Sequence, residues 1–83
     1  MEKVLIGGLA MQKLGSTRFT NDVDYLIFDS SSEKLFSFDE ENNTDYVNAA
    51  ANSFYAQIWE MRNGEIATAQ MLSEMKAFAL VQH

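Results

Sequence analysis

The chain has 83 residues, of which 47% are hydrophobic, and twelve acidic against six basic residues give a net charge of -6. This length predicts a single domain over residues 1–83, the apolar share excludes a disordered chain, and the negative charge argues against a non-specific nucleic-acid binder. There is no cysteine and the only histidine is His83, so disulfides, zinc-thiolate sites and histidine-based triads are not expected.

The first half of the chain predicts two strands joined through a short helix. Residues 4–6 form an aliphatic run closed by the glycine pair 7–8, which is typical of a buried strand before a tight turn. Residues 9–14 allow a short helix that Gly15 would end. After a polar, turn-rich segment, residues 22–28 are rich in β-branched and aromatic side chains and predict a second strand.

The second half predicts a further strand and two helices. Residues 35–38 fit either a brief strand or an irregular apolar plug, and residues 45–49 fit a strand. Residues 52–61 favour a helix, with a strand over 54–59 as the alternative. Thr68 can cap a last helix, running to near the terminus, whose apolar stripe comprises Met71, Leu72, Met75, Phe78 and Ala79. Together these elements predict a mixed α+β fold of the α/β type, with a small mixed sheet flanked by helices.

Two aspartates in the second predicted strand could hold a divalent metal ion. Asp22 and Asp24 are two residues apart, so both would point to one face of the strand while Val23 turns into the core. Such a pair of like charges is tolerable around Mg²⁺ or Mn²⁺, for which carboxylates and substrate phosphates are suitable ligands. Asp45, at the start of the next plausible strand, is the best candidate for a third carboxylate. The alternatives are an acidic strand end and, for Asp45, an ordinary turn residue.

The glycine turn and the residues before the aspartates could bind phosphate. Without Cβ atoms, Gly7 and Gly8 would let backbone N–H groups approach a phosphate closely at a helix start. Arg18 and Thr20 could also contact a substrate phosphate. An arginine beside two aspartates is equally expected as a surface partner that relieves their repulsion.

Taken in order, Ile6-Gly7-Gly8-Leu9-Ala10, Gly15, Arg18, Thr20 and Asp22-Val23-Asp24 resemble the signature of polymerase-beta-like nucleotidyltransferases, most closely the small prokaryotic branch of minimal nucleotidyltransferases and abortive-infection toxins. The resemblance implies a pared-down nucleotidyltransferase fold in which Asp22, Asp24 and Asp45 bind metal and carry catalysis. It also implies a phosphate contact from Lys76, which without the family would be an ordinary solvated lysine. Relatives usually place a helix and a strand before the third carboxylate, whereas only residues 25–44 separate Asp24 from Asp45 here.

The expected reaction is transfer of a nucleoside monophosphate from an NTP to an acceptor, which can be a protein, a tRNA or a small molecule. The alternative is a non-catalytic nucleotide-binding or toxin–antitoxin regulatory module that keeps the fold. In that case an exposed edge strand and the last helix would support a homodimer. The longest apolar runs fall far short of a membrane span and no signal-peptide pattern is present, so a cytoplasmic protein without a membrane partner is expected.

Overall fold

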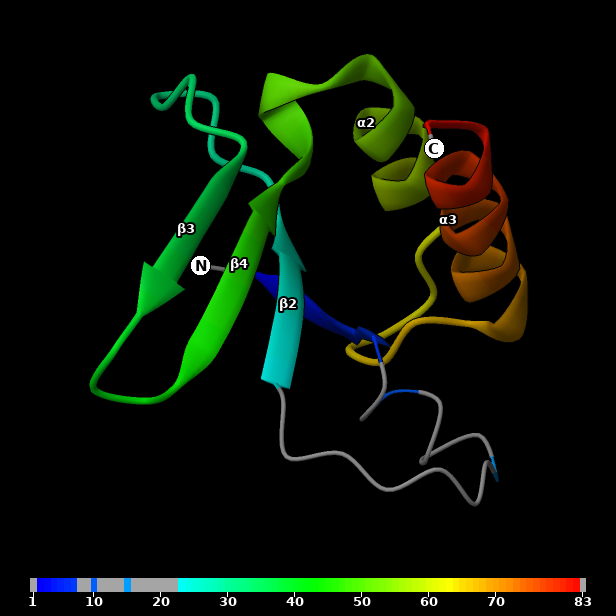
Figure 1. Cartoon of the computed structure of the whole chain (residues 1–83), viewed down its shortest axis with the longest axis horizontal. Coiled ribbons are helices and arrows are strands. Elements are labelled where there is room, and N and C mark those ends of the chain that lie inside the picture. The colour runs from blue at the N-terminus through cyan, green and yellow to red at the C-terminus, as the bar shows by residue number, and fades with distance from the viewer. Residues whose placement is uncertain (1, 8–9, 11–14, 16–22, 83) are drawn as a thin grey trace.

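A computed structural model describes residues 2–7, 10, 15 and 23–82 of the chain (Figure 1). These described residues include a four-stranded mixed sheet and the two helices α2 and α3, which confirms the predicted mixed α+β class. The elements in chain order are β1 (Lys3–Ile6), β2 (Val23–Ile27), β3 (Phe36–Asp39), β4 (Thr44–Asn48), the short 3₁₀ helix η1 (Ala49–Ala51), α2 (Ser53–Glu60) and α3 (Ala69–Gln82).

The sheet has the strand order β1-β2-β4-β3, so β4 lies between two strands that precede it in the sequence. β1 is antiparallel to β2, and β3 is antiparallel to β4. After β2 the chain forms the edge strand β3 and turns back through a hairpin, where Asn43 adopts a left-handed conformation with φ of 50°. The hairpin returns β4 beside β2 in the parallel direction. The position of β4 between β2 and β3 therefore decides which residues of β2 and β4 lie opposite each other.

Helices α2 and α3 pack against one face of the sheet. Paired residues in neighbouring strands point to the same face, so Val4 and Leu26 lie side by side there, and both are fully buried with Ile58 of α2 and Met71 of α3. In Figure 1 the two helices lie over the β1–β2 side of the sheet, and β3 lies at the opposite edge. The helices therefore cover the sheet unevenly, and the hydrophobic core lies on the β1–β2 side.

A side chain caps the first turn of each helix, Asn52 before α2 and the predicted cap Thr68 before α3. The Asn52 side chain accepts hydrogen bonds from the backbone N–H groups of Phe54 and Tyr55, and the Thr68 hydroxyl oxygen accepts one from Met71 N–H. These bonds satisfy donors that the first turn of a helix leaves without partners. The helical interpretation of residues 52–61 is thus confirmed, and the strand alternative for 54–59 is wrong.

The remaining sequence predictions for local structure divide into three groups. The strands over 4–6 and 45–49 are confirmed with shifts of one residue at their ends, and residues 36–39 form a strand rather than an apolar plug. The second strand is described from Val23 onward. The predicted helix over 9–14, apart from residue 10, lies outside the described residues.

The two outer edges of the sheet differ. On the β1 edge, the Leu5 N–H donates to Glu65 C=O and the Ala67 N–H donates to Leu5 C=O, each at 2.8 Å. On the opposite edge, β3 pairs with β4 on its inner side, and no strand of the described part of the chain pairs with its outer side. Neither described helix has the length and apolarity that a membrane crossing requires.

Candidate functional site

Asp24 and Asp45 lie side by side on the two central strands. They are partners in the parallel β2–β4 register, so their side chains point to the same face, and neighbouring strands are separated by about 4.8 Å. Asp45 is exposed and Asp24 is half-buried. We call these two residues the carboxylate pair.

The pair lies where three segments of the chain meet. Asp24 and Asp45 are each the second residue of their strand, and the starts of two parallel strands meet at the same edge of the sheet. β1 runs in the opposite direction and ends there, with Ile6 paired to Asp24 and Gly7 following directly. Gly7 and both carboxylates are therefore brought together.

Gly7 is in close contact with Asp24. Its φ of +76° lies in the left-handed region, and a Cβ atom placed on it would lie 2.5 Å from Asp24 Oδ2. A side chain at this position would both strain the backbone and displace the carboxylate. Sequence analysis assigned Gly7 to phosphate binding, but within the described residues its missing side chain makes room for the Asp24 carboxylate.

Of the other predicted site residues, the structure describes Lys76 alone. Gly8, Arg18, Thr20 and Asp22 lie outside the described residues. Lys76 is exposed on α3, and its ammonium group forms no hydrogen bond or ion pair with another described residue. Among the described residues, no group of three or more His, Cys, Asp or Glu side chains is arranged to hold a metal ion. The described part of the site therefore contributes two carboxylates and one glycine.

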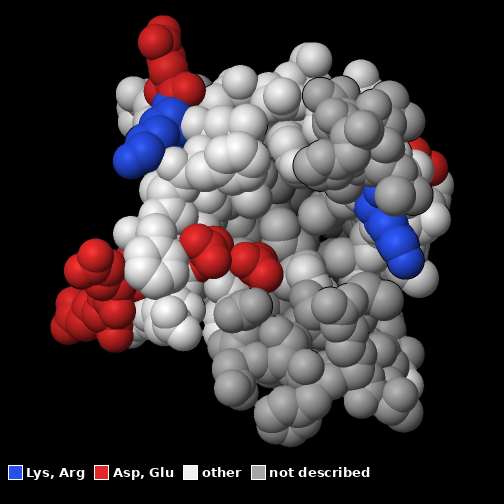
Figure 2. All heavy atoms as spheres, viewed as in Figure 1, with Lys and Arg blue, Asp and Glu red and all other residues white. Residues whose placement is uncertain are grey.

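The chemistry of this donor set fits a hard divalent cation. Carboxylate oxygens are ligands that Mg²⁺ and Mn²⁺ favour, whereas soft metals favour sulfur ligands, which the carboxylate pair does not offer. Two parallel carboxylates at one strand spacing repel each other, and a cation between them would relieve that repulsion. The face in Figure 2 shows acidic side chains near its centre, away from the basic ones.

The acidic hairpin turn beyond β3 has a different role. The Asp39 carboxylate accepts hydrogen bonds from Glu41 N–H and from Asn42, including one of 2.7 Å from the Asn42 side chain. The hydrogen bond from the Asn42 side chain is the main cause that lowers the pKa of Asp39 below its ordinary value. Asp39 pairs with Thr44, the neighbour of Asp45, and so points to the opposite face of the sheet. Asp39 thus fixes the turn and does not join the carboxylate pair.

Phe38 extends the site toward the sheet edge, and the sequence analysis did not assign it a role. It pairs with Asp45 in the β3–β4 register and is 53% exposed. A row across all four strands, in the order Ile6, Asp24, Asp45 and Phe38, therefore shares one face. The only sequence signal for it was the alternation of Phe36 and Phe38 with polar residues before a turn.

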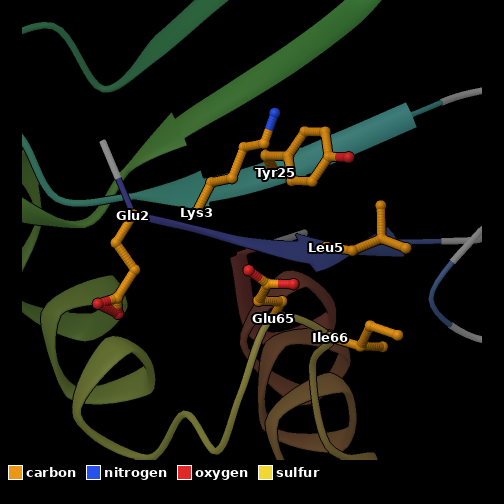
Figure 3. A pocket seen from close by; sticks show the side chains of 6 residues that line it. All are labelled: Glu2, Lys3, Leu5, Tyr25, Glu65 and Ile66. Carbon is orange, nitrogen blue, oxygen red and sulfur yellow. The ribbon is translucent and has the colours of Figure 1, made fainter.

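A surface pocket, which we call the hollow, lies on the face of the sheet opposite the carboxylate pair (Figure 3). Leu5 and Tyr25 are partners in the β1–β2 register and alternate with the residues that carry the site. The Lys3 ammonium lies over the Tyr25 ring, 4.4 Å from its centroid. The residues that line this hollow are Glu2, Lys3, Leu5, Tyr25, Glu65 and Ile66. Because the carboxylate pair points away from it, the hollow is separate from the candidate site.

A comparison of the chain with protein-family models gives no match, and comparisons with curated proteins and with solved structures give no significant match either.

Proposed function

We propose that the chain is a metal-dependent nucleotidyltransferase-like domain that transfers a nucleoside monophosphate from an NTP to an acceptor hydroxyl. The observation that carries the proposal is the in-register placement of Asp24 and Asp45 on parallel strands, with Gly7 packed against Asp24. Two carboxylates and a glycine turn are the parts that a site for a metal-bound triphosphate requires.

The roles follow from position in the fold. Asp24 and Asp45, with Asp22 from the preceding segment, would hold Mg²⁺ or Mn²⁺, which when bound would neutralise charge on the triphosphate and the departing pyrophosphate. Asp45 is the more exposed carboxylate and would orient the acceptor hydroxyl. The backbone at Gly7 and Gly8 would contact phosphate, and Arg18, Thr20 and Lys76 remain proposed phosphate contacts. Catalysis would come from positioning and charge neutralisation.

The short segment between the two aspartates is compatible with this proposal. Residues 29–43 contain β3 and its turn but no helix. The strand order nevertheless places β4 directly beside β2, so Asp45 reaches the neighbouring position of Asp24 without the longer insertion. The short connection therefore still brings Asp45 beside Asp24, as the proposed site requires.

Transfer of labelled nucleotide tests this proposal. The protein is incubated with labelled NTPs, Mg²⁺ or Mn²⁺ and a cell extract, and label transfer is compared in the natural protein, Asp22→Asn and Asp45→Asn. Asp39→Asn is the matched control, because Asp39 is an acidic residue of the same hairpin on the opposite face. We expect transfer by the natural protein and the control only. Absence of transfer together with absence of metal-dependent nucleotide binding by calorimetry would refute the proposal.

A second candidate function is a non-catalytic nucleotide-binding or toxin–antitoxin module that pairs with another copy. The observation that favours it is the edge strand β3, where Phe36 and Phe38 are 58% and 53% exposed. An edge strand with exposed aromatic residues is a template for pairing with another chain. Nucleotide binding without transfer, together with a dimer by light scattering, would favour this function. A monomer across the micromolar range would exclude the dimer.

A further inference from the structure

We propose that Phe38 is the stacking surface for the base of the donor nucleotide. The proposal rests on the nucleotidyltransferase function proposed above and adds a base-binding residue to the same site. It arises from the row of residues that crosses the sheet at the level of the carboxylate pair.

The register places Phe38 directly beside the carboxylate pair. Phe38 is the partner of Asp45, as Asp45 is the partner of Asp24, so the three side chains share one face of the sheet. Successive strands are about 4.8 Å apart, and Phe38 is therefore roughly 10 Å from Asp24 across the strands. This span is comparable to the length of a nucleotide from its phosphate to its base. A nucleotide with its phosphates at the pair can therefore lay its base on Phe38.

The Phe38 ring is available for stacking. It is 53% exposed although it lies on the same face as the core, because α2 and α3 cover the β1–β2 side of the sheet (Figure 1). Among the described residues, the other aromatic rings apart from Phe36 and Phe38 each lie against another ring, in contacts among Tyr25, Tyr46, Phe28, Trp59, Phe54, Tyr55 and Phe78. Phe38 thus combines an unstacked ring with a place next to the carboxylates.

Phenylalanine also defines what kind of recognition this surface can give. Its ring has no hydrogen-bond donor or acceptor, so it can bind the flat face of a base but cannot read the edge. Stacking of this kind tolerates every base because each has a π face. Phe38 by itself would therefore strengthen the binding of all four nucleotides, with differences that follow stacking strength.

Phe36 provides the matched control that the chain itself supplies. It has the same side chain, strand and face as Phe38 and a similar exposure of 58%, but its partner is Val47 instead of Asp45. A general role of the apolar edge, such as dimer formation, would involve both residues. A base platform at the carboxylate pair would depend on Phe38 alone.

Calorimetry with two probes tests the inference, using a non-hydrolysable ATP analogue and inorganic tripolyphosphate, each with Mg²⁺. We expect Phe38→Ala to weaken binding of the analogue about tenfold, the size of one base–aromatic stack, and to leave tripolyphosphate binding unchanged. Phe36→Ala should change neither by more than about twofold. Phe38→Trp should retain affinity, and its fluorescence should be quenched by the base but not by tripolyphosphate.

The outcomes separate this inference from the proposed function. If the natural protein binds both probes, Asp45→Asn weakens both, and Phe38→Ala weakens neither, the base platform is refuted and the transferase proposal stands. If Phe38→Ala and Phe36→Ala weaken the analogue equally, the platform is also refuted, and a shared role of the edge is indicated. If the natural protein binds neither probe, both proposals fail.

Discussion

The two ends of the β2–β4 strand pair carry polar residues in opposite situations. At one end, Asn48 is 4% exposed and its side chain accepts hydrogen bonds from Asp29 and Ala50 N–H and donates to the C=O groups of Asp29 and Ser32. At the other end, Asp45 is exposed and lies in register with Asp24, a group of like charge. The same two strands thus carry a buried amide whose donors and acceptor are all hydrogen-bonded at one end, and two neighbouring carboxylates at the other.

The contrast shows how structural and functional polar residues can be separated. A buried amide with every donor and acceptor satisfied stabilises the fold, because removal of its side chain leaves several backbone groups without partners. Two like charges on neighbouring strands repel each other and cost stability, which is the arrangement expected of the proposed cation site. Mutations at the two ends should therefore have opposite consequences for stability and activity.

The largest effect is expected at the carboxylate pair. Asp45→Asn should lower label transfer about 10³-fold, because a charge that stabilises the reacting groups is lost. Its free energy of unfolding should stay the same or rise by up to about 1 kcal/mol, since repulsion with Asp24 is removed. Urea unfolding and the transfer assay measure the two quantities. A loss of stability that matches the loss of activity would show that Asp45 is a structural residue.

At the opposite end, Asn48→Ala should lower the free energy of unfolding by about 3 kcal/mol, because buried partners lose their hydrogen bonds. Asn63→Ala, at an exposed position, is the control and should change it by less than about 0.5 kcal/mol. Under conditions where the Asn48 variant remains folded, nucleotide binding should be retained. Equal stability of the two variants in urea unfolding would disprove the structural role of Asn48.

The contact between Gly7 and Asp24 can be tested with a second glycine. Gly7→Ala should destabilise the protein by about 2 kcal/mol, since it combines a left-handed φ with a clash against Asp24. Gly64→Ala has a similar φ of +99° but no atom within 4 Å of the new Cβ, so about 1 kcal/mol is expected. Thermal unfolding compares the two. If the two variants lose the same stability, Gly7 does not shape the carboxylate pair.

Loss of the helix cap at Asn52 should have a smaller effect on stability. Asn52→Ala removes the side-chain acceptor for Phe54 and Tyr55 N–H, which lie 2.9 and 3.3 Å away, and should cost about 1 kcal/mol without changing nucleotide binding. Circular dichroism during urea unfolding measures the loss. Asn52→Asp, which keeps an acceptor oxygen, should retain most of the stability, and a full loss in that variant would exclude capping as the cause.

The smallest effect is expected at the surface ion pair between Glu2 and Arg62. A 2.7 Å hydrogen bond from Arg62 Nε is the main cause that lowers the pKa of Glu2 below its ordinary value of 4.5. A carboxyl whose pKa is lower in the folded state stabilises it above the unfolded pKa, and this contribution disappears as pH falls through the folded pKa. Glu2→Gln should therefore be slightly less stable than the natural protein at pH 7, and this difference should shrink as the pH falls from 7 to 3. A constant difference across this range would contradict the assignment.

Local signals made much of the fold predictable. The aliphatic run before Gly7 and the stripe from Met71 to Phe78 each mark one element, and Thr68 supplies the predicted cap of the last helix. The edge strand β3 could not be distinguished from an apolar plug, because it has four residues and both of its phenylalanines are exposed. Burial of one face gives a strand its alternation of apolar and polar residues, and this effect is weak in β3 because it lies at the exposed edge of the sheet.

The site was predictable in its parts but not in its arrangement. Asp24 and Asp45 could be selected as carboxylates at strand starts, but their register depends on the insertion of β4 between β2 and β3, which is a tertiary property. For the same reason, neither the contact of Gly7 with Asp24 nor the position of Phe38 beside Asp45 had a local signature. The assignment to nucleotidyltransferases stays a prediction from the motif.

Binding of Mn²⁺ to the folded protein tests the central claim most directly, because electron paramagnetic resonance counts free and bound ions without any assumption about the acceptor. With an NTP analogue present, we predict that the natural protein and Asp39→Asn bind Mn²⁺, and that Asp24→Asn and Asp45→Asn each weaken this binding at least tenfold while remaining folded. Undiminished Mn²⁺ binding in both Asp24→Asn and Asp45→Asn would contradict the account.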